Sequence, residues 1–275
     1  TYENPATGVR VRRLTRAVDD GFRSDLIPGI KASADARRLA DELAFAAARL
    51  AELTVEPPGT YADAALAEDR EEGLWLAFLT AWVSPAEGPE PFAAVRAVAV
   101  PWSGAELPAL RDDLPRGPRA GALDPRTPPG YRAWASRAGG QAAALAGDAA
   151  WTAERRFARA FERLALPGLA RAARFDFLAS AGRLGLAELS PDALHLGGDE
   201  PTTLAAKRVF GIGDTLLLER RAADLAAGTG VPLGALDLAL FNWGQPAGAR
   251  RATMGSAAQP SDEQCSTIAG ALGLA

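Results

Sequence analysis

Apolar residues recur at helical spacing along most of this chain, and no run alternates in the way that a half-buried strand does. Residues 33–53 predict a helix with Ser33 as its cap and an inner face of Leu39, Leu43, Ala47 and Leu50. Residues 73–85 are apolar nearly all round, which is typical of a buried helix. The pattern therefore predicts an all-α protein.

The middle of the chain adds a strongly amphipathic helix over residues 151–166. On its polar face Arg155, Arg159 and Arg163 repeat at helical spacing, which fits either a solvated face or a phosphate-binding one. Residues 171–181, a segment starting at Ser190 and the residues from Ser261 onward predict further short helices. Residues 101–150 are rich in Pro, Gly and Arg and predict one helix at most, over residues 131–145.

Residues 202–243 predict a helix, a tight turn, a second helix, a loop and a third helix. Thr202 or Thr203 is expected to cap the first helix, and Gly211-Ile212-Gly213 reverses the chain. Asp214 is then expected to cap the second helix, whose buried stripe is Leu218, Ala222 and Leu225. A glycine turn that leads into a helix presents unpaired amides and the positive end of the helix dipole to a phosphate.

This order, with Asp237 following a loop rich in Gly and Pro, resembles the helix-hairpin-helix DNA glycosylase superfamily. The segments GLWLAFLTAWVSP, VFGIGDTLLLERRAADLA and VPLGALDLALFNWG look like the branch known as alpha-glutamyl/putrescinyl thymine pyrophosphorylase. The resemblance covers roughly residues 70–100 and 150–245. It implies a two-lobed helical fold, double-stranded DNA as the partner and a base flipped out of the stack.

The resemblance implies that Asp237 is the catalytic carboxylate, facing the sugar of the flipped nucleotide. Members that also cut the strand carry a lysine where this chain has Thr215, so the implied enzyme is a monofunctional glycosylase. From the residues alone, Asp237 as a mere helix cap stays equally open. The expected DNA contacts are Gly211, Ile212, Gly213, Asp214, Thr215, Arg155, Arg159 and Arg163, and the candidate base-pocket residues are Trp82, Ser84, Asn242 and Trp243.

Composition narrows the chemistry further. A formal net charge of −4 argues against a protein that coats nucleic acid, although residues 111–175 hold twelve arginines against six acids. A single cysteine, Cys265, excludes an internal disulfide and a multi-cysteine metal cluster. His195 is the only histidine, so a site with several histidine ligands is excluded. We expect no cofactor and no metal.

The sequence predicts three parts: a helical lead-in (1–60), a helical barrel (61–243) with the hairpin at 202–226, and a C-terminal segment (244–275). The lead-in is expected to pack with the C-terminal segment. No apolar stretch of membrane-spanning length and no signal pattern is present, so a cytoplasmic monomer is expected. The implied function is excision of a modified pyrimidine, such as a hypermodified phage base, which would serve antiviral defence. The alternatives are a base-modifying transferase on the same scaffold and a non-catalytic DNA-binding protein.

Overall fold

The computed structural model describes residues 2, 3, 10, 11, 17–104, 106–109, 113–246 and 248–274. Within them the regular secondary structure is helical, apart from one antiparallel pair of two-residue strands, β1 (Tyr2–Glu3) and β2 (Arg10–Val11). The prediction of an all-α protein is confirmed. The helices are α1 (Ser33–Val55), α2 (Thr60–Ala65), α3 (Arg70–Val83), α4 (Ala93–Val98), α5 (Thr127–Arg137), α6 (Gln141–Ala146), α7 (Ala153–Arg163), α8 (Arg171–Arg183), α9 (Pro201–Phe210), α10 (Thr215–Thr229), α11 (Leu233–Gly244) and α12 (Asp262–Ala271).

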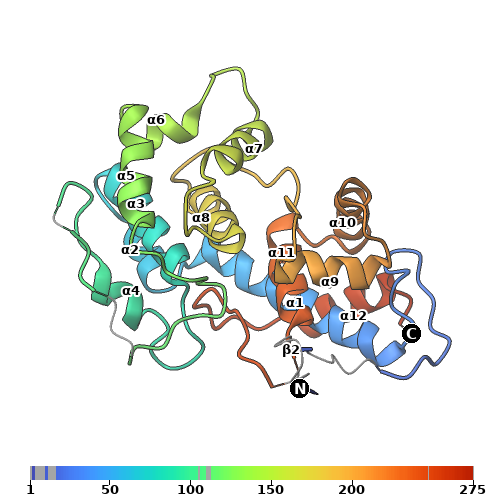
Figure 1. Cartoon of the computed structure of the whole chain (residues 1–275). Coiled ribbons are helices and arrows are strands. Elements are labelled where there is room, and N and C mark those ends of the chain that lie inside the picture. Colours follow the sequence, from blue (N-terminus) through green and yellow to red (C-terminus); the bar gives the residue numbers. More distant parts are fainter. Residues whose placement is uncertain are drawn as a thin grey trace.

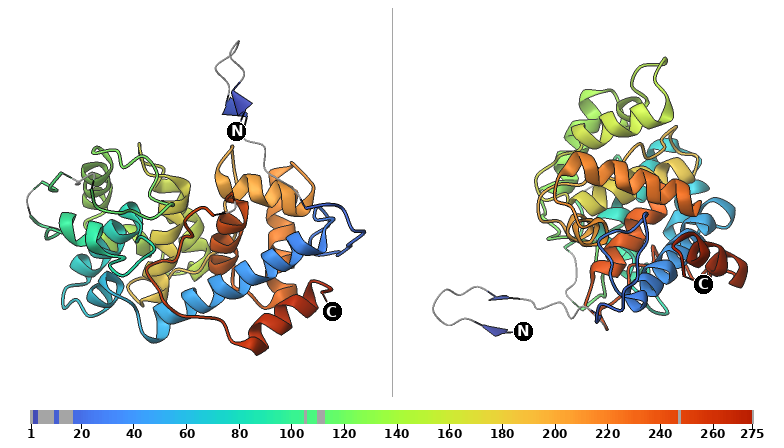
Figure 2. Two further views of the ribbon diagram at one scale, coloured as in Figure 1. Left: turned by 90° about the horizontal axis from the view of Figure 1, so that it is seen from below. Right: turned by 90° about the vertical axis from the view of Figure 1, so that its right-hand side faces the viewer.

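The helices gather into two groups that lie side by side (Figure 1). One group is built on α3, which packs against α2, α4, α6 and α8, with α5 and α7 packed on α6. The other is built on α11, which packs against α1, α9 and α10. Figure 2 shows α12 beside α1, and α1 also touches α8, so this long helix ties the two groups together.

The apolar stripes are buried as the sequence pattern predicts. Leu39, Leu43, Ala47 and Leu50 of α1 all lie in the core, as do Leu218, Ala222 and Leu225 of α10. In the first helix group, stacked rings fill the centre: Phe78 and Tyr131 lie with their centroids 3.8 Å apart. The Tyr131 hydroxyl donates to Gln141 Oε1 at 2.8 Å, which satisfies the one polar atom of that ring.

Two local predictions are wrong. Residues 131–145 form parts of two helices, because Gly139 and Gly140 both adopt positive φ and break the chain between α5 and α6. The Glu71 carboxylate then caps α6 by accepting from the amides of Gln141 and Ala142. The segment from Ser190 onward is a loop instead of a helix, because the Glu219 carboxylate takes up the Leu194 and Leu196 amides that a helix would use.

In the part of the chain that the structure describes, no individual helix is both long enough and apolar enough to span a bilayer. Taken together, α10 and α11 meet that length and composition test, but they are bent by 107° at the break between them.

Candidate functional site

The hairpin between α9 and α10 forms as its sequence predicts. Gly211 ends α9 in the left-handed conformation, at φ 68° and ψ 21°, and its amide donates to the Lys207 carbonyl at 3.0 Å. Asp214 caps α10, because its side chain accepts from the Leu217 amide at 2.9 Å. The expected cap at the other end is wrong: α9 begins at Pro201 without a side-chain cap, and Thr203 Oγ1 instead accepts from the Gly197 amide.

One side of this turn is open. Gly211, Gly213, Asp214 and Thr215 are exposed, and Ile212 is half-buried against the core. A Cβ at Gly213 would meet nothing within 4 Å. Among the described residues, no hydrogen-bond acceptor is paired with the amides of Gly213 and Thr215. The turn thus presents free backbone donors at the start of a 15-residue helix, which is the arrangement that suits a phosphate oxygen.

The other side of the turn is held by the segment around Gly29. Its amide donates to the Val209 carbonyl at 2.8 Å, and a Cβ at Gly29 would lie 2.2 Å from the Arg208 carbonyl oxygen. Only a glycine permits this approach. The chain's two lysines also lie on this part of the molecule: Lys207 in the last turn of α9, and Lys31 lining a small hollow with Arg208. Basic side chains therefore lie near the turn, together with Asp35 in the same hollow and Asp214 at the start of α10.

Asp237, the expected catalytic residue, lies inside α11 and not at its start, since that helix begins at Leu233. The reading of Asp237 as a helix cap is therefore wrong. Its carboxylate is fully buried and is bound by two arginines: Arg119 Nη2 donates to Oδ1 at 2.5 Å, and Arg171 Nη2 donates to Oδ2. The expected opening toward a DNA groove is not present in this arrangement, because both oxygens are occupied.

A second carboxylate completes what we call the buried ion cluster: Arg119, Arg171, Asp176 and Asp237. Arg119 holds Asp176 through two hydrogen bonds of 2.7 Å, from Nε and Nη2. Arg171 also donates to the Leu194 carbonyl. The two arginines and two aspartates balance in formal charge. The ion pairs of Asp237 connect α11 to two other parts of the chain: Arg171 is the first residue of α8, and Arg119 lies in the loop before α5. The cluster therefore bridges the two helix groups.

The two carboxyls of the cluster are shifted in opposite directions. Burial raises the pKa of Asp237, but the charges of Arg171 and Arg119 and their hydrogen bonds outweigh it, so the pKa lies below its ordinary value. At Asp176 burial raises the pKa more than Arg119 lowers it, and the nearby Asp237 charge raises it further. Asp237 is thus ionised at neutral pH, beside a carboxyl that holds its proton more tightly than usual.

The cluster has spare donors. Arg119 Nη1 and Arg171 Nη1 are both buried and have no hydrogen-bond partner among the described residues. An unpaired guanidinium N–H inside a protein is costly, and an anionic oxygen or a water satisfies it best. These two N–H donors are therefore left unsatisfied by the described part of the chain.

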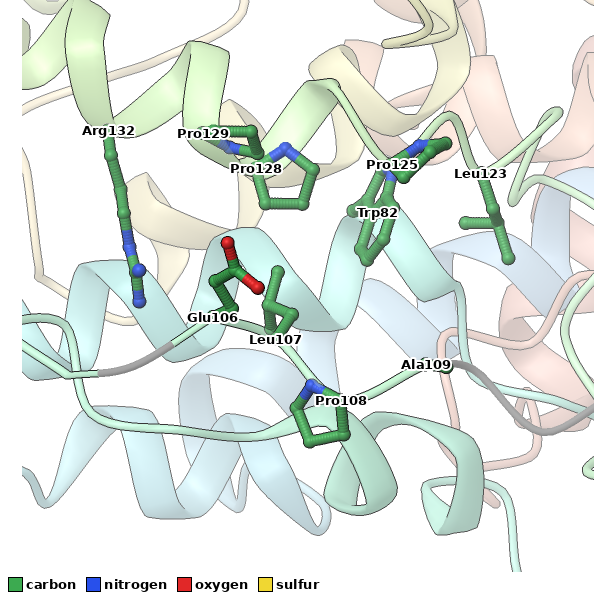
Figure 3. A pocket seen from close by; sticks show the side chains of 10 residues that line it. All are labelled: Trp82, Glu106, Leu107, Pro108, Ala109, Leu123, Pro125, Pro128, Pro129 and Arg132. Atoms are coloured by element: carbon green, nitrogen blue, oxygen red, sulfur yellow. The ribbon is translucent and has the colours of Figure 1, made fainter.

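The four candidate base-pocket residues fall in different places. Trp82 lines a cavity of about 390 Å³ (Figure 3). Ser84 ends α3 at φ 59° and is buried, and its carbonyl accepts from the Gly117 amide. Asn242 is locked to the backbone of Ala252 by hydrogen bonds of 2.8 and 3.1 Å. Trp243 is buried, and its Nε1 donates to the Asp35 carbonyl. The structure does not bring Asn242 or Trp243 to that cavity.

Three of the arginines of α7, Arg155, Arg159 and Arg163, are exposed and lie in the helix group opposite the hairpin (Figure 1). The Arg155 guanidinium lies over the Trp151 ring, 5.2 Å from its centroid, and Arg159 pairs with Glu162 at 2.9 Å. Such exposed pairs are weak, so these side chains can exchange partners at little cost. Their placement fits both a solvated face and an outlying DNA contact.

The sequence pattern missed Arg119, Arg171 and Asp176. One signal was present: an aspartate inside the apolar segment GALDLALFNW cannot be buried without a counter-charge, so a partner cation had to exist. The pattern could not say which of thirty basic residues supplies it. No group of three or more potential metal ligands occurs in the described part of the chain.

Comparison of the chain with models of protein families, with curated proteins and with solved structures yields no match.

Proposed function

We propose that this chain binds double-stranded DNA through the hairpin between α9 and α10. The observation that carries the proposal is the open turn at Gly213, where free amides at the start of α10 lie beside Lys31, Lys207 and Arg208. Backbone donors and a helix dipole bind a phosphate without reading sequence. The overall charge of −4 does not oppose this, because a duplex meets the local surface.

Binding of a fluorescent duplex, followed by anisotropy at two salt concentrations, tests the proposal. Gly213→Glu places a negative charge in the open space of the turn and is expected to weaken binding at least about tenfold. Gly270→Glu is the matched control: this glycine is also exposed with nothing within 4 Å, on α12 near the far end of α10. Equal affinity of the two variants would refute the proposal.

We also propose a reaction for the bound state: excision of a modified pyrimidine base by a monofunctional glycosylase, with Asp237 as its carboxylate. Its support is the ionised state of Asp237 and its place on the helix that follows the hairpin. A carboxylate between two guanidiniums presents little net negative field, so it stabilises a cationic sugar only after at least one arginine withdraws. Phosphates compete well for guanidinium groups, so DNA itself is the natural trigger for release.

Duplexes that carry different modified pyrimidines, treated with alkali after incubation to cleave abasic sites, test the reaction. Asp237→Asn is expected to abolish strand breaks while duplex binding persists. Asp176→Asn is the matched control, because it alters the same cluster without changing the proposed catalytic group. Thermal melting of both variants establishes that they are folded.

The full burial of Asp237 specifically favours a second function, a DNA-binding protein without chemistry. In that case the cluster only joins the two helix groups. The excision assay separates the catalytic from the non-catalytic function. If the unaltered protein binds the duplex but produces no abasic site on any substrate, the non-catalytic function is supported.

A further inference from the structure

A short stretch of the loop between α8 and α9, residues 194–196, contacts both the hairpin and the buried ion cluster. This loop carries the chain from the first helix group to the second (Figure 1). The side chains of Leu194 and Leu196 are buried, so both ends of the stretch are anchored in the core. We call it the 194–196 segment.

Glu219 holds the segment from the side of the hairpin. Its carboxylate accepts from the Leu194 amide at 2.8 Å and from the Leu196 amide at 2.5 Å. Glu219 lies in the second turn of α10, four residues after Thr215, so it stands on the same face of the helix as that first residue. One helix therefore carries both the open turn and the carboxylate that fixes the segment.

Arg171 holds the segment from the side of the cluster. Its Nη2 donates to the Leu194 carbonyl, and its Nε donates to the His195 carbonyl at 3.4 Å. The same Nη2 also donates to Asp237 Oδ2. The position of the segment therefore helps to set the position of the Arg171 guanidinium, and with it how firmly the Asp237 carboxylate is held.

The segment has a backbone conformation that depends on these contacts. His195, its central residue, has a φ of 52°, in the left-handed region that few residues other than glycine occupy. Its ring stacks on Phe161 of α7 with the centroids 4.1 Å apart, and its Nε2 lies 2.9 Å from Asp192 Oδ1. Such a conformation persists only where the surrounding contacts enforce it. Loss of the Glu219 contacts is therefore expected to let the segment relax.

We propose that Glu219 is a positioning residue that transmits DNA binding at the hairpin to Asp237. A phosphate bound at the start of α10 stands about one helical turn, roughly 6 Å along the axis, from Glu219. Its negative charge disfavours the Glu219 carboxylate in its present place, which loosens the Leu194 and Leu196 amides. The segment then relaxes and withdraws its carbonyls from Arg171, so that Asp237 loses one of its two arginines.

This inference rests on the proposed binding of DNA at the hairpin and adds the route by which a bound duplex reaches the cluster. Hydrogen exchange of the backbone amides, with and without a saturating duplex, tests it. In the unaltered protein the duplex is expected to accelerate exchange of the Leu194 and Leu196 amides about fivefold or more. Gly213→Glu is expected to abolish that acceleration together with duplex binding.

Glu219→Gln removes the charge and one of the two acceptor oxygens. The Leu194 and Leu196 amides are then expected to exchange rapidly in the free protein, and a bound duplex should accelerate them no further. Asp224→Asn is the matched control, because it removes the same charge from an exposed position of the same helix. This control is expected to respond to the duplex as the unaltered protein does.

A second measurement needs no DNA. Glu219→Gln and Arg171→Lys both act on the 194–196 segment, so the shift of the urea midpoint in the double variant is expected to be smaller than the sum of the two single shifts. The shifts of Asp224→Asn and Arg171→Lys are expected to add. The exchange experiment does not use Arg171→Lys, so it decides the question even if that variant fails to fold.

A duplex that binds without changing exchange of the segment, or that accelerates it equally in Glu219→Gln, overturns this inference and leaves the hairpin proposal intact. Additive urea shifts for Glu219→Gln and Arg171→Lys overturn it as well. Absence of any duplex binding that depends on Gly213 refutes the hairpin proposal instead, and this inference with it.

Discussion

At the scale of single residues, Asp237 has the most consequential environment in the protein. It is fully buried, and its two oxygens each pair with a different arginine, Arg119 and Arg171. Burying a charge is tolerated only when a partner compensates it. Whatever chemistry the protein performs, this residue therefore also contributes to joining α11 to α8 and to the loop before α5.

Removal of the Asp237 charge is expected to be strongly destabilising. Asp237→Asn leaves Arg171 buried without a carboxylate, and loss of one partner from a buried pair typically costs about 3 to 5 kcal/mol. Asp176→Asn is expected to cost less, since burial already disfavours the ionised form of that carboxyl. Urea unfolding of the two variants measures both changes. A smaller loss for Asp237→Asn than for Asp176→Asn contradicts the assignment of the charges.

The same carboxyl predicts a pH dependence with a definite sign. Because the pKa of Asp237 is lowered in the folded protein, its ionisation stabilises the fold above the ordinary pKa of about 3.9. That contribution is lost as the pH falls below about 3.9 through the folded-state pKa. The difference in free energy of unfolding between the unaltered protein and Asp237→Asn should therefore be constant near neutrality and shrink in acid. A difference that grows as the pH falls contradicts the lowered pKa.

At this scale the sequence indicated Asp237 but not its surroundings. Arg119 lies 118 positions from it and Arg171 lies 66 positions from it, and neither stands at a spacing that a local pattern can reveal. Their pairing depends on how two groups of helices meet, which is set by packing over the whole core. The expectation of an accessible carboxylate failed for the same reason.

At the scale of elements, local chemistry explains why the hairpin was predicted almost completely. The Asp214 cap and the Gly211 turn each depend on residues within three or four positions. The segment around Gly29 could not be foreseen as their support, because it comes from about 180 positions earlier in the chain. The mistaken helix after Ser190 has a similar origin in Glu219, which belongs to α10.

The two turn glycines are expected to respond differently to substitution by alanine. Gly211 has a positive φ, and its Cβ would lie 3.1 Å from Gly29 Cα, so Gly211→Ala should destabilise the protein by about 1 kcal/mol or more. Gly213 has open space and no positive φ, so Gly213→Ala should leave the melting temperature nearly unchanged. Thermal unfolding of both variants measures the difference. Equal shifts of the melting temperature in Gly211→Ala and Gly213→Ala would contradict the described turn.

At the scale of the whole molecule, the question is whether a duplex contacts one helix group or both. The hairpin belongs to the group built on α11, whereas the exposed arginines of α7 belong to the group built on α3 (Figure 1). Two of the twelve arginines between residues 111 and 175, Arg119 and Arg171, are buried counter-ions and add nothing to the surface. The basic surface is therefore smaller than the sequence suggests, and α7 carries an important share of it.

The salt dependence of duplex binding measures how much of the DNA contact is made by α7. Each phosphate that the protein neutralises contributes about 0.9 to the slope of log affinity against log salt concentration. If DNA reaches both groups, replacing Arg155, Arg159 and Arg163 by glutamine should lower the slope by up to about 3. Replacing Lys31 and Lys207 instead should lower it by up to about 2. A slope that falls only in the lysine variant would confine the duplex to the hairpin. The wider DNA contact that includes α7 would then be contradicted.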